Sequence, residues 1–219
     1  KSGHTPTLFS AFLYFDISFM VWYLLGPLAV QIATNLELDA QQRGIMVATP
    51  ILSGALLRLL LGFLADRLSP KLAGVIGQLI VILSLSIAWL LGIDSYEQTL
   101  LLGLGLGFAG ASFAVALPLA SQWYPPEHQG TALGIAGAGN SGTVLAALFA
   151  PGLAYLFGWQ NVFGLALIPL SITLLVFLLL ARNAPDRPPP AALADYARAL
   201  RNTDSAWFMF FYSITFGGF

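Results

Sequence analysis

The sequence predicts an all-α membrane protein, and three observations lead to that class. Hydrophobic residues make up 58% of the 219 residues and charged residues only 9%, whereas a soluble domain carries about 25% charged residues. The apolar residues gather in runs of roughly 20 or more, the length that a helix needs to cross a bilayer. The polar residues lie mainly in short segments between these runs. A water-soluble globule is therefore excluded.

Six complete membrane spans are expected, followed by the start of a seventh. The six cover residues 8–33, 44–65, 72–92, 98–123, 130–157 and 161–181, and the seventh apolar run extends from about Ser205 to Phe219. The connectors are short and polar except for the sixth, residues 182–204. Its proline-rich first part is expected to be extended and stiff. Its second part, ALADYARALRN, is typical of a short amphipathic helix at the membrane surface.

This order of elements predicts three parts: a six-helix transmembrane half (residues 1–181), a cytoplasmic linker (182–204) and the start of a second transmembrane half (205–219). Two-half transporters are built in this way. Because the chain begins at Lys1 and ends within an apolar run, we expect the C-terminal half to lie on the same polypeptide. A rhomboid-like or other six-span protein is the alternative, and it usually carries intramembrane Ser and His residues or metal ligands.

The basic residues predict the orientation, because cytoplasmic loops carry an excess of Lys and Arg. Only Arg43 falls on one side of the alternating spans. The other side carries seven basic residues: Lys1, Arg67, Lys71, Arg182, Arg187, Arg198 and Arg201. We therefore expect a multi-pass protein of the cytoplasmic (inner) membrane, with its N-terminus and the long connector in the cytoplasm.

Charge and residue content exclude several function classes. The 9 basic and 10 acidic residues nearly cancel, so no basic field attracts nucleic acid. The chain has no cysteine, and its two histidines, His4 and His128, are too few and too far apart for a metal site. No nucleophile–base pair, metal cluster or phosphate loop lies in or beside an apolar run. The sequence therefore predicts neither an enzyme nor a cofactor, and the bilayer is the expected surrounding.

Arg58 is the strongest candidate for a functional residue. It lies within the second span, where a guanidinium costs about 2.5–3.5 kcal/mol on insertion scales. Its permanent charge and planar set of donors suit a flat, monovalent anion. The alternative is a structural ion pair with Asp16, an acidic residue in the first span.

The loop after the second span carries a first resemblance. GFLADRLSPK, residues 62–71, resembles the signature between spans two and three of the major facilitator superfamily, roughly G-x-x-x-D-R-x-G-x-K/R. Ser69-Pro70 stands where the family often has a glycine. In the superfamily, the acid and the bases of this loop bridge helix ends and hold the outward-open state. The resemblance assigns that gating role to Gly62, Asp66, Arg67 and Lys71.

Three further segments resemble the nitrate/nitrite porter family of that superfamily. GFAGASFAVALPLASQWYPPEHQGTALGIAGAGNSG, residues 107–142, ends in the G-N-x-G of the family's glycine-rich fifth span. SGALLRLLLGF matches the family's arginine-bearing second span, and YSITFGGF matches the start of its seventh. The agreement covers nearly the whole chain and about half of a full family member.

The resemblance implies a secondary transporter of nitrate, nitrite or both, which works by alternating access. In it, an arginine holds the anion, an asparagine amide donates to it, aromatic rings form walls and a glycine exposes backbone. The residues given these roles are Arg58, Asn140, Phe113, Tyr212, Phe216 and Gly137. At a helical rise of 1.5 Å per residue, the residues of this set other than Gly137 lie about 10–16 Å from the cytoplasmic ends of their spans. That depth is near the middle of a bilayer hydrocarbon core about 30 Å thick. The alternatives are helix–helix bonding for Asn140 and lipid or core contact for the aromatic residues.

Asp16 is the candidate for proton coupling, because an acid within a span is costly unless it is protonated or paired. This favours nitrate–proton symport. The alternative roles of Asp16 are a structural partner of Arg58 or a hydrated group near the interface. The alternative functions are nitrate/nitrite antiport without protons, transport of another small anion, organic acid or drug, and a membrane sensor or assembly subunit that moves no solute.

Glycine pairs in spans four and five predict close helix packing. Gly103 and Gly107 form one G-x-x-x-G pair, and Gly130 and Gly134 form another. Small residues at this spacing let helix backbones approach one another in a membrane.

Overall fold

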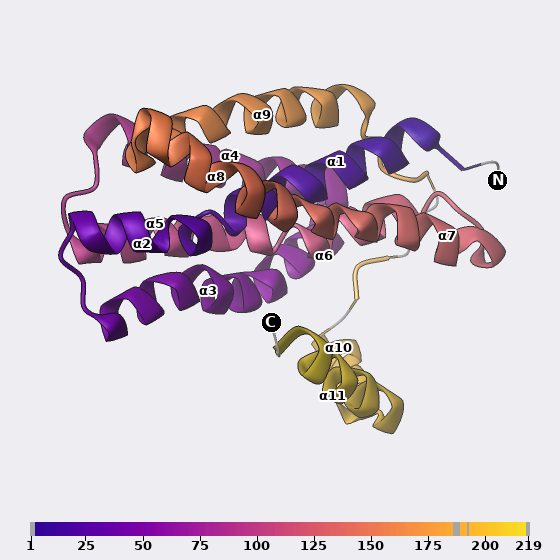
Figure 1. Ribbon diagram of the computed structural model, residues 1–219. Coiled ribbons are helices and arrows are strands. Elements are labelled where there is room, and N and C mark those ends of the chain that lie inside the picture. The colour runs from indigo at the N-terminus through magenta and orange to yellow at the C-terminus, as the bar shows by residue number, and fades with distance from the viewer. Residues whose placement is uncertain (1–2, 186–188, 192, 218–219) are drawn as a thin grey trace. The chain divides into compact units, whose positions relative to one another are not determined.

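The computed structural model describes residues 3–185, 189–191 and 193–217. Over these residues the chain forms helices and turns, with no β-strand (Figure 1). The chain divides into two compact units, residues 1–187 and residues 188–219.

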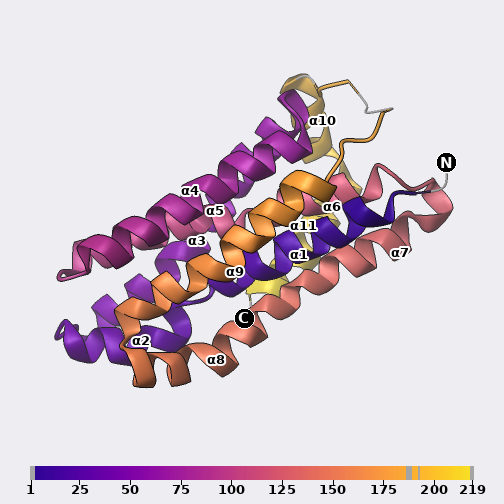
Figure 2. The same ribbon diagram turned by 90° about the horizontal axis from the view of Figure 1, so that it is seen from above.

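The first unit contains six segments that are long and apolar enough to cross a membrane. Spans two, three and six are single helices: α3 (Ala40–Arg67), α4 (Pro70–Leu91) and α9 (Trp159–Leu180). Spans one, four and five are interrupted: α1 (Thr5–Trp22) and α2 (Leu25–Asn35); α5 (Tyr96–Gly110) and α6 (Phe113–Ser121); α7 (Pro126–Gly137), the 3₁₀ turn η1 (Ala138–Ser141) and α8 (Gly142–Phe157). The spans run side by side in a bundle (Figures 1 and 2). The predicted fold class is confirmed, and the predicted span bounds agree to within a few residues.

The N-terminus, two loops and the end of α9 meet at one end of the bundle. The Lys71 ammonium donates a hydrogen bond to the Leu178 carbonyl of α9 (2.8 Å), and the Trp123 indole N–H donates to the Arg182 carbonyl (2.8 Å). The His4 ring stacks on Trp123 with 4.8 Å between ring centroids. The sequence placed the basic loops on one side of the membrane, and these contacts bring the loops after spans two and four to one end.

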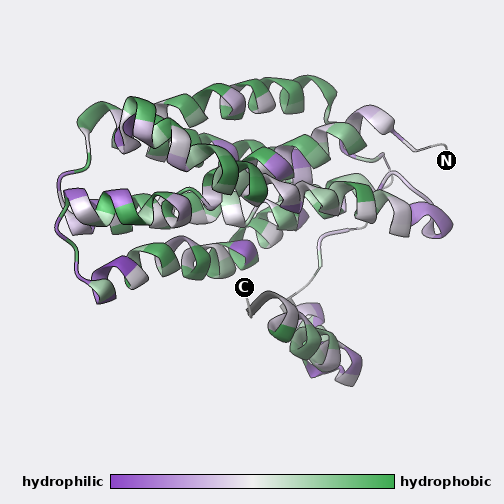
Figure 3. Ribbon diagram, viewed as in Figure 1, coloured by the Kyte–Doolittle hydropathy of each residue, from purple (hydrophilic) through white to green (hydrophobic). Residues whose placement is uncertain are grey.

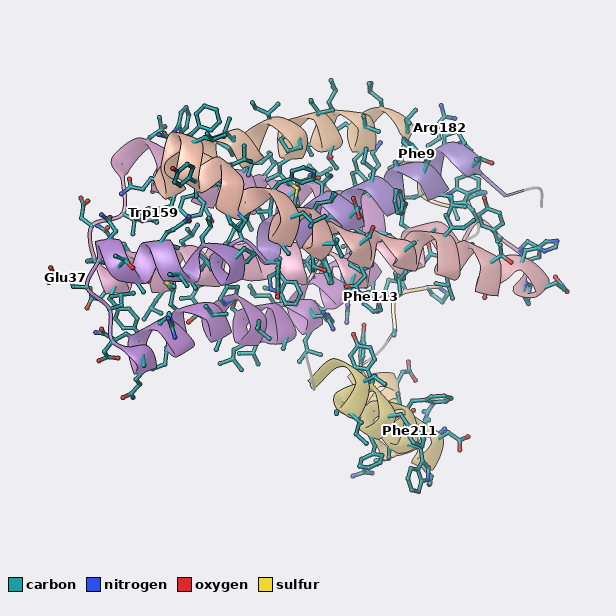
Figure 4. The ribbon with its side chains drawn as sticks, viewed as in Figure 1. Phe9, Glu37, Phe113, Trp159, Arg182 and Phe211 are labelled. Carbon is teal, nitrogen blue, oxygen red and sulfur yellow. The ribbon has the colours of Figure 1, made fainter. Side chains whose placement is uncertain are left out.

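The remaining loops meet at the opposite end. The Trp159 indole N–H donates to the Asn35 side-chain oxygen (3.3 Å), and the Gln160 amide donates to the Ile93 carbonyl (3.1 Å). Figure 4 shows Glu37 and Trp159 at this end, away from Arg182. Loops that alternate between two ends are what six successive membrane crossings require.

Helix starts follow from local sequence. The Asp39 carboxylate accepts a hydrogen bond from the Gln42 N–H (2.8 Å) and, with the Gln42 side chain, forms a capping box at the start of α3. Ser69 caps α4 by accepting from the Leu72 N–H (3.1 Å), and Pro70 occupies the first helical turn. Ser69-Pro70 therefore starts α4 at the point where the superfamily signature has a glycine.

The first and fourth spans are the most enclosed of the six. More than half of each is buried, compared with 22% of the second span and 28% of the fifth. Figure 3 shows apolar residues along the spans and hydrophilic ones mainly in the loops and at helix ends. The second and fifth spans therefore present faces that the described residues of the first unit leave uncovered.

The second unit consists of two helices, α10 (Leu193–Arg201) and α11 (Thr203–Gly217). The segment predicted as an amphipathic helix is helical, and Arg198 pairs with Asp195 across one turn (3.3 Å). The expected seventh span is helical from Thr203 onward. The location of α10 at a membrane surface stays a prediction.

Candidate anion site

Arg58 and Phe113 come together, as the sequence predicted for two residues of one site. Arg58 lies on α3 and is half-buried. Its Nη2 donates to the Gly110 carbonyl of α5 (3.2 Å), and its guanidinium carbon lies 5.2 Å from the centroid of the Phe113 ring. Figure 4 labels Phe113 near the middle of the bundle. The positive charge thus lies against an aromatic face, beside the interruption of span four.

The interruption of span four makes the Gly110 carbonyl available to Arg58. In a continuous helix this oxygen would accept from the Ala114 N–H. Here the Ala114 N–H donates to the Ala111 carbonyl instead (3.0 Å). A backbone acceptor freed within a membrane needs another partner. The guanidinium provides it, so the interruption supports a charge that would otherwise be costly.

A row of aromatic rings runs from Phe113 along α1. The Phe15 ring meets Phe113 edge to face at 5.6 Å and Phe19 at 4.3 Å, and Phe19 lies 4.8 Å from Trp22. The Trp22 indole donates to the Pro50 carbonyl of α3 (2.8 Å). Phe19 is fully buried. Phe19 therefore supports its neighbours and does not line an open path.

Asn140 and Gly137 lie together around the interruption of span five. Asn140 is exposed within η1, and its carbonyl accepts a hydrogen bond from the Thr143 hydroxyl (3.0 Å). A Cβ built at Gly137 would meet no atom within 4 Å. Both residues thus face space that the described residues leave open, where an anion or a second helical half has room.

Helix α1 connects the two groups of candidate residues. Phe15 touches the Phe113 ring on one side. On its other side, a Cβ built at Gly139 would lie 2.8 Å from the Phe15 ring, so the turn of Asn140 packs directly on α1. Arg58 and Phe113, and Gly137 and Asn140, are therefore two groups that share α1 as their support.

Asp16 has a partner that the sequence did not reveal. The Ser141 hydroxyl donates to its carboxylate (2.7 Å), and the Gly142 N–H lies beside the same carboxyl group as a second donor. Asp16 is only 7% exposed. The side chain is therefore largely enclosed by the first unit, and its role in proton coupling stays a prediction. Ser141 lies within the G-N-S-G segment, so its position in that motif was the available signal.

The two glycine pairs differ in what they face. A Cβ at Gly103 would lie 3.0 Å from the Thr49 side chain, and one at Gly107 would overlap α3. At Gly130 and Gly134 a Cβ would meet nothing within 4 Å. Close packing is confirmed for the first pair and is not seen for the second within the described part of the chain.

The loop with the superfamily signature joins helix ends through Lys71. The Lys71 ammonium binds α9, and the Lys71 backbone N–H donates a hydrogen bond to the Asn183 side-chain oxygen (3.1 Å). Arg67 lies over an aromatic ring of its own helix, 5.1 Å from the centroid, and Asp66 is exposed. A Cβ at Gly62 would make only ordinary contact, at 3.9 Å.

Tyr212 lies on α11 in the second unit and is exposed. The side chain of Phe216 falls outside the described residues, as do Lys1 and Arg187 of the charge pattern. The contribution of Tyr212 and Phe216 to the site stays a sequence prediction.

The Major Facilitator Superfamily profile matches residues 11–219. The chain is 35% identical over 208 residues to "Probable nitrate/nitrite transporter NarK2" of Mycobacterium tuberculosis, an alignment that covers 93% of this chain and 52% of that protein. It is 31% identical to "Nitrite extrusion protein" of Bacillus subtilis, with 92% and 50% covered, and 38% identical to "Probable nitrate/nitrite antiporter NarK1" of Thermus thermophilus, with 64% and 31% covered. The chain spans about half the length of the first two of these relatives.

Solved structures agree on the fold. A bacterial homolog of the human lysosomal transporter Spinster, in its inward-facing and occupied conformation, matches with a TM-score of 0.72 over 90% of this chain and 48% of that one. The unoccupied form matches with a TM-score of 0.71 over 89% of this chain and 47% of that one. Both are 21% identical in sequence, so the likeness concerns the fold alone.

Proposed function

The chain belongs to the nitrate/nitrite porter family of the major facilitator superfamily, and on that premise we propose that it forms the N-terminal half of a secondary transporter for nitrate, nitrite or both. It is a multi-pass membrane protein with six crossing helices. Relatives that align with most of the chain carry names of nitrate or nitrite transporters. The proposed activity is solute movement by alternating access, with no catalytic step.

The observation that carries the proposal is the pair of contacts made by the Arg58 guanidinium. This group donates to a backbone carbonyl and lies against an aromatic ring, which together hold a permanent positive charge within a membrane span. A charge in low-dielectric surroundings attracts a small anion far more strongly than it does in water. The planar fork of donors matches the flat oxygen set of nitrate, and the Phe113 ring keeps water away from one side.

Asn140 and Gly137 are proposed as the second contact. The Asn140 amide supplies a neutral donor to an anion that has lost its water shell, and the open side of Gly137 leaves room for it. Tyr212 and Phe216, from the start of the second half, complete the proposed walls.

The proposed transport cycle uses two halves. Residues 1–181 form the N-terminal half, 182–204 a cytoplasmic linker and 205–219 the start of the C-terminal half. The halves rock about the central site, and the uncovered faces of spans two and five are where the second half packs. Gly62, Asp66, Arg67 and Lys71 form the proposed gating loop. The end of the bundle that holds Lys71 and Arg182 is the proposed cytoplasmic end of a protein in the inner membrane.

Proton symport is the proposed coupling, with Asp16 as the proton carrier. Asp16 provides the one carboxyl group of α1, enclosed beside its hydroxyl partner, on the helix that supports both groups of site residues. Nitrate/nitrite antiport is the second candidate, favoured by the name of the Thermus thermophilus relative. An imposed pH gradient drives nitrate accumulation in vesicles under the first mechanism, whereas internal nitrite drives it under the second.

Counterflow in proteoliposomes tests the substrate. Vesicles loaded with unlabelled nitrate are expected to accumulate external labelled nitrate, and unlabelled nitrite is expected to compete. Sulfate and lactate serve as controls for another small anion and for an organic acid. Uptake that lactate abolishes and nitrate does not would contradict the proposal, and so would the absence of any counterflow from correctly folded protein.

A further inference from the structure

The turn that carries Asn140 is fixed to helix α1 by a side-chain hydrogen bond. Span five tightens into the 3₁₀ turn η1, and Ser141, the last residue of that turn, donates its hydroxyl to the Asp16 carboxylate over 2.7 Å. Asp16 is almost fully buried. A short bond to a buried charged acceptor is among the stronger hydrogen bonds in a protein.

The glycines beside Ser141 bring the turn close enough for this bond. A Cβ at Gly139 would lie 2.9 Å from the Asp16 nitrogen. A Cβ at Gly142 would overlap the Asp16 carbonyl oxygen and lie 2.8 Å from the Met20 nitrogen. The backbone of η1 therefore lies directly on the backbone of α1, while Asn140, between these glycines, faces outward and is exposed.

A second donor of the turn lies at the same carboxyl group. The Gly142 N–H, next in the chain after Ser141, lies beside the Asp16 carboxyl group while it also donates to carbonyls of η1. Asp16 therefore meets both the side chain and the backbone of the turn.

We propose that Ser141 is a positioning residue for the anion site: its bond to Asp16 fixes the η1 turn, and through the turn it fixes the direction of the Asn140 amide. This rests on the proposed function, in which Asn140 contacts nitrate. Without the Ser141 hydroxyl, the turn keeps its van der Waals contacts with α1 but loses this hydrogen bond. The Asn140 amide then no longer has a fixed direction. Substrate affinity then falls, while the rocking of the two halves is retained.

Transport kinetics in membrane vesicles test the functional part, with the full-length protein. Loss of one hydrogen bond to a charged group corresponds to about a tenfold change. We therefore expect Ser141→Ala to raise the KM for nitrate by about tenfold with little change in the maximal rate. The matched pair Ser141→Thr and Ser141→Val separates the hydroxyl from side-chain shape: the threonine variant is expected to keep the parent KM and the valine variant to lose it.

Thiol labelling tests the structural part without reference to nitrate. The chain has no cysteine, and any cysteine elsewhere in the full-length protein is first replaced by serine. Ala138→Cys places an exposed reporter on η1, and Leu148→Cys places an exposed control on α8. We expect Ser141→Ala and Ser141→Val to speed maleimide labelling at position 138 severalfold and to leave position 148 unchanged.

The two measurements have separate outcomes. Unchanged labelling at position 138, or equal KM values for the threonine and valine variants, overturns the positioning role of Ser141. Faster labelling in a parent protein that moves no nitrate overturns the proposed substrate and leaves Ser141 as the residue that fixes the turn.

Discussion

Spans four and five both contain glycine pairs and a helix interruption, but these features do different things in the two spans. In span four, Gly103 and Gly107 press onto α3, and the interruption after Gly110 offers a carbonyl to Arg58. In span five, Gly130 and Gly134 face open space, and the interruption at η1 lies on α1. Span four is therefore packed against the other helices of its unit, whereas span five packs on one side only.

The difference teaches that glycines within membrane spans have three physical uses. Gly103 and Gly107 allow packing between neighbouring helices. Gly139 and Gly142 allow backbone to lie on backbone, which no side chain permits. Gly134 leaves a face uncovered, where a second half has access. What a glycine does thus depends on the surface opposite it and not on its spacing.

The largest expected effect comes from filling the backbone contact of span five. Gly142→Val would place side-chain atoms on the Asp16 carbonyl, and backbone cannot move aside as a side chain can. We expect little folded protein in the membrane, measured by monodispersity and thermal unfolding after purification. Gly152→Val, also on α8 but in open space, is the matched control. Equal stability of the two variants would show that η1 does not lie on α1 in this way.

The next effect concerns the charge that span four supports. Arg58→Lys keeps the charge but loses the planar fork that reaches both the Gly110 carbonyl and an anion. We expect nitrate uptake to fall by at least about tenfold, with thermal stability close to that of the parent. Arg43→Lys, at the opposite end of α3, is the control and is expected to transport normally. Near-normal uptake by Arg58→Lys in vesicles would count against the proposed site.

A narrower effect is expected from Asp16→Asn. The amide oxygen still accepts from Ser141, so the turn is expected to stay in place, but the side chain no longer carries a proton. We expect nitrate counterflow to continue and accumulation driven by a pH gradient to be lost. Full pH-driven accumulation in this variant would exclude Asp16 as the proton carrier and would leave antiport as the better candidate.

The smallest effect separates the two glycine pairs. Gly134→Ala adds a methyl group in open space on a helix, and such a change stabilises by about 0.4–1 kcal/mol. Gly103→Ala pushes on the Thr49 side chain and is expected to destabilise by about 1–3 kcal/mol. Chemical or thermal unfolding of the full protein measures both. A loss of stability from Gly134→Ala in the full protein would contradict an open face there and would indicate that the second half packs against it.

The sequence could predict the fold because apolar runs of sufficient length allow few alternatives in a bilayer. It also predicted that Arg58 and Phe113 belong together. It could not predict the Gly110 carbonyl as the partner of Arg58, because α5 ends within an apolar run that shows no proline at that point. The bond between Asp16 and Ser141 joins residues 125 positions apart. The G-N-S-G motif singled out the segment of Ser141, but one sequence does not name Asp16 as its partner.

The joined end of the bundle has a mechanical consequence. The segment that follows α9 is attached at its first residues. The Trp123 indole donates to the Arg182 carbonyl, and the Arg182 N–H donates to the Thr7 hydroxyl (3.0 Å). The Asn183 side-chain oxygen accepts from the backbone N–H of Lys71 at the start of α4. Spans one, three, four and six therefore share one anchor at the root of the proline-rich segment. A force on the chain at Arg182 is therefore shared by four spans and does not act on α9 alone.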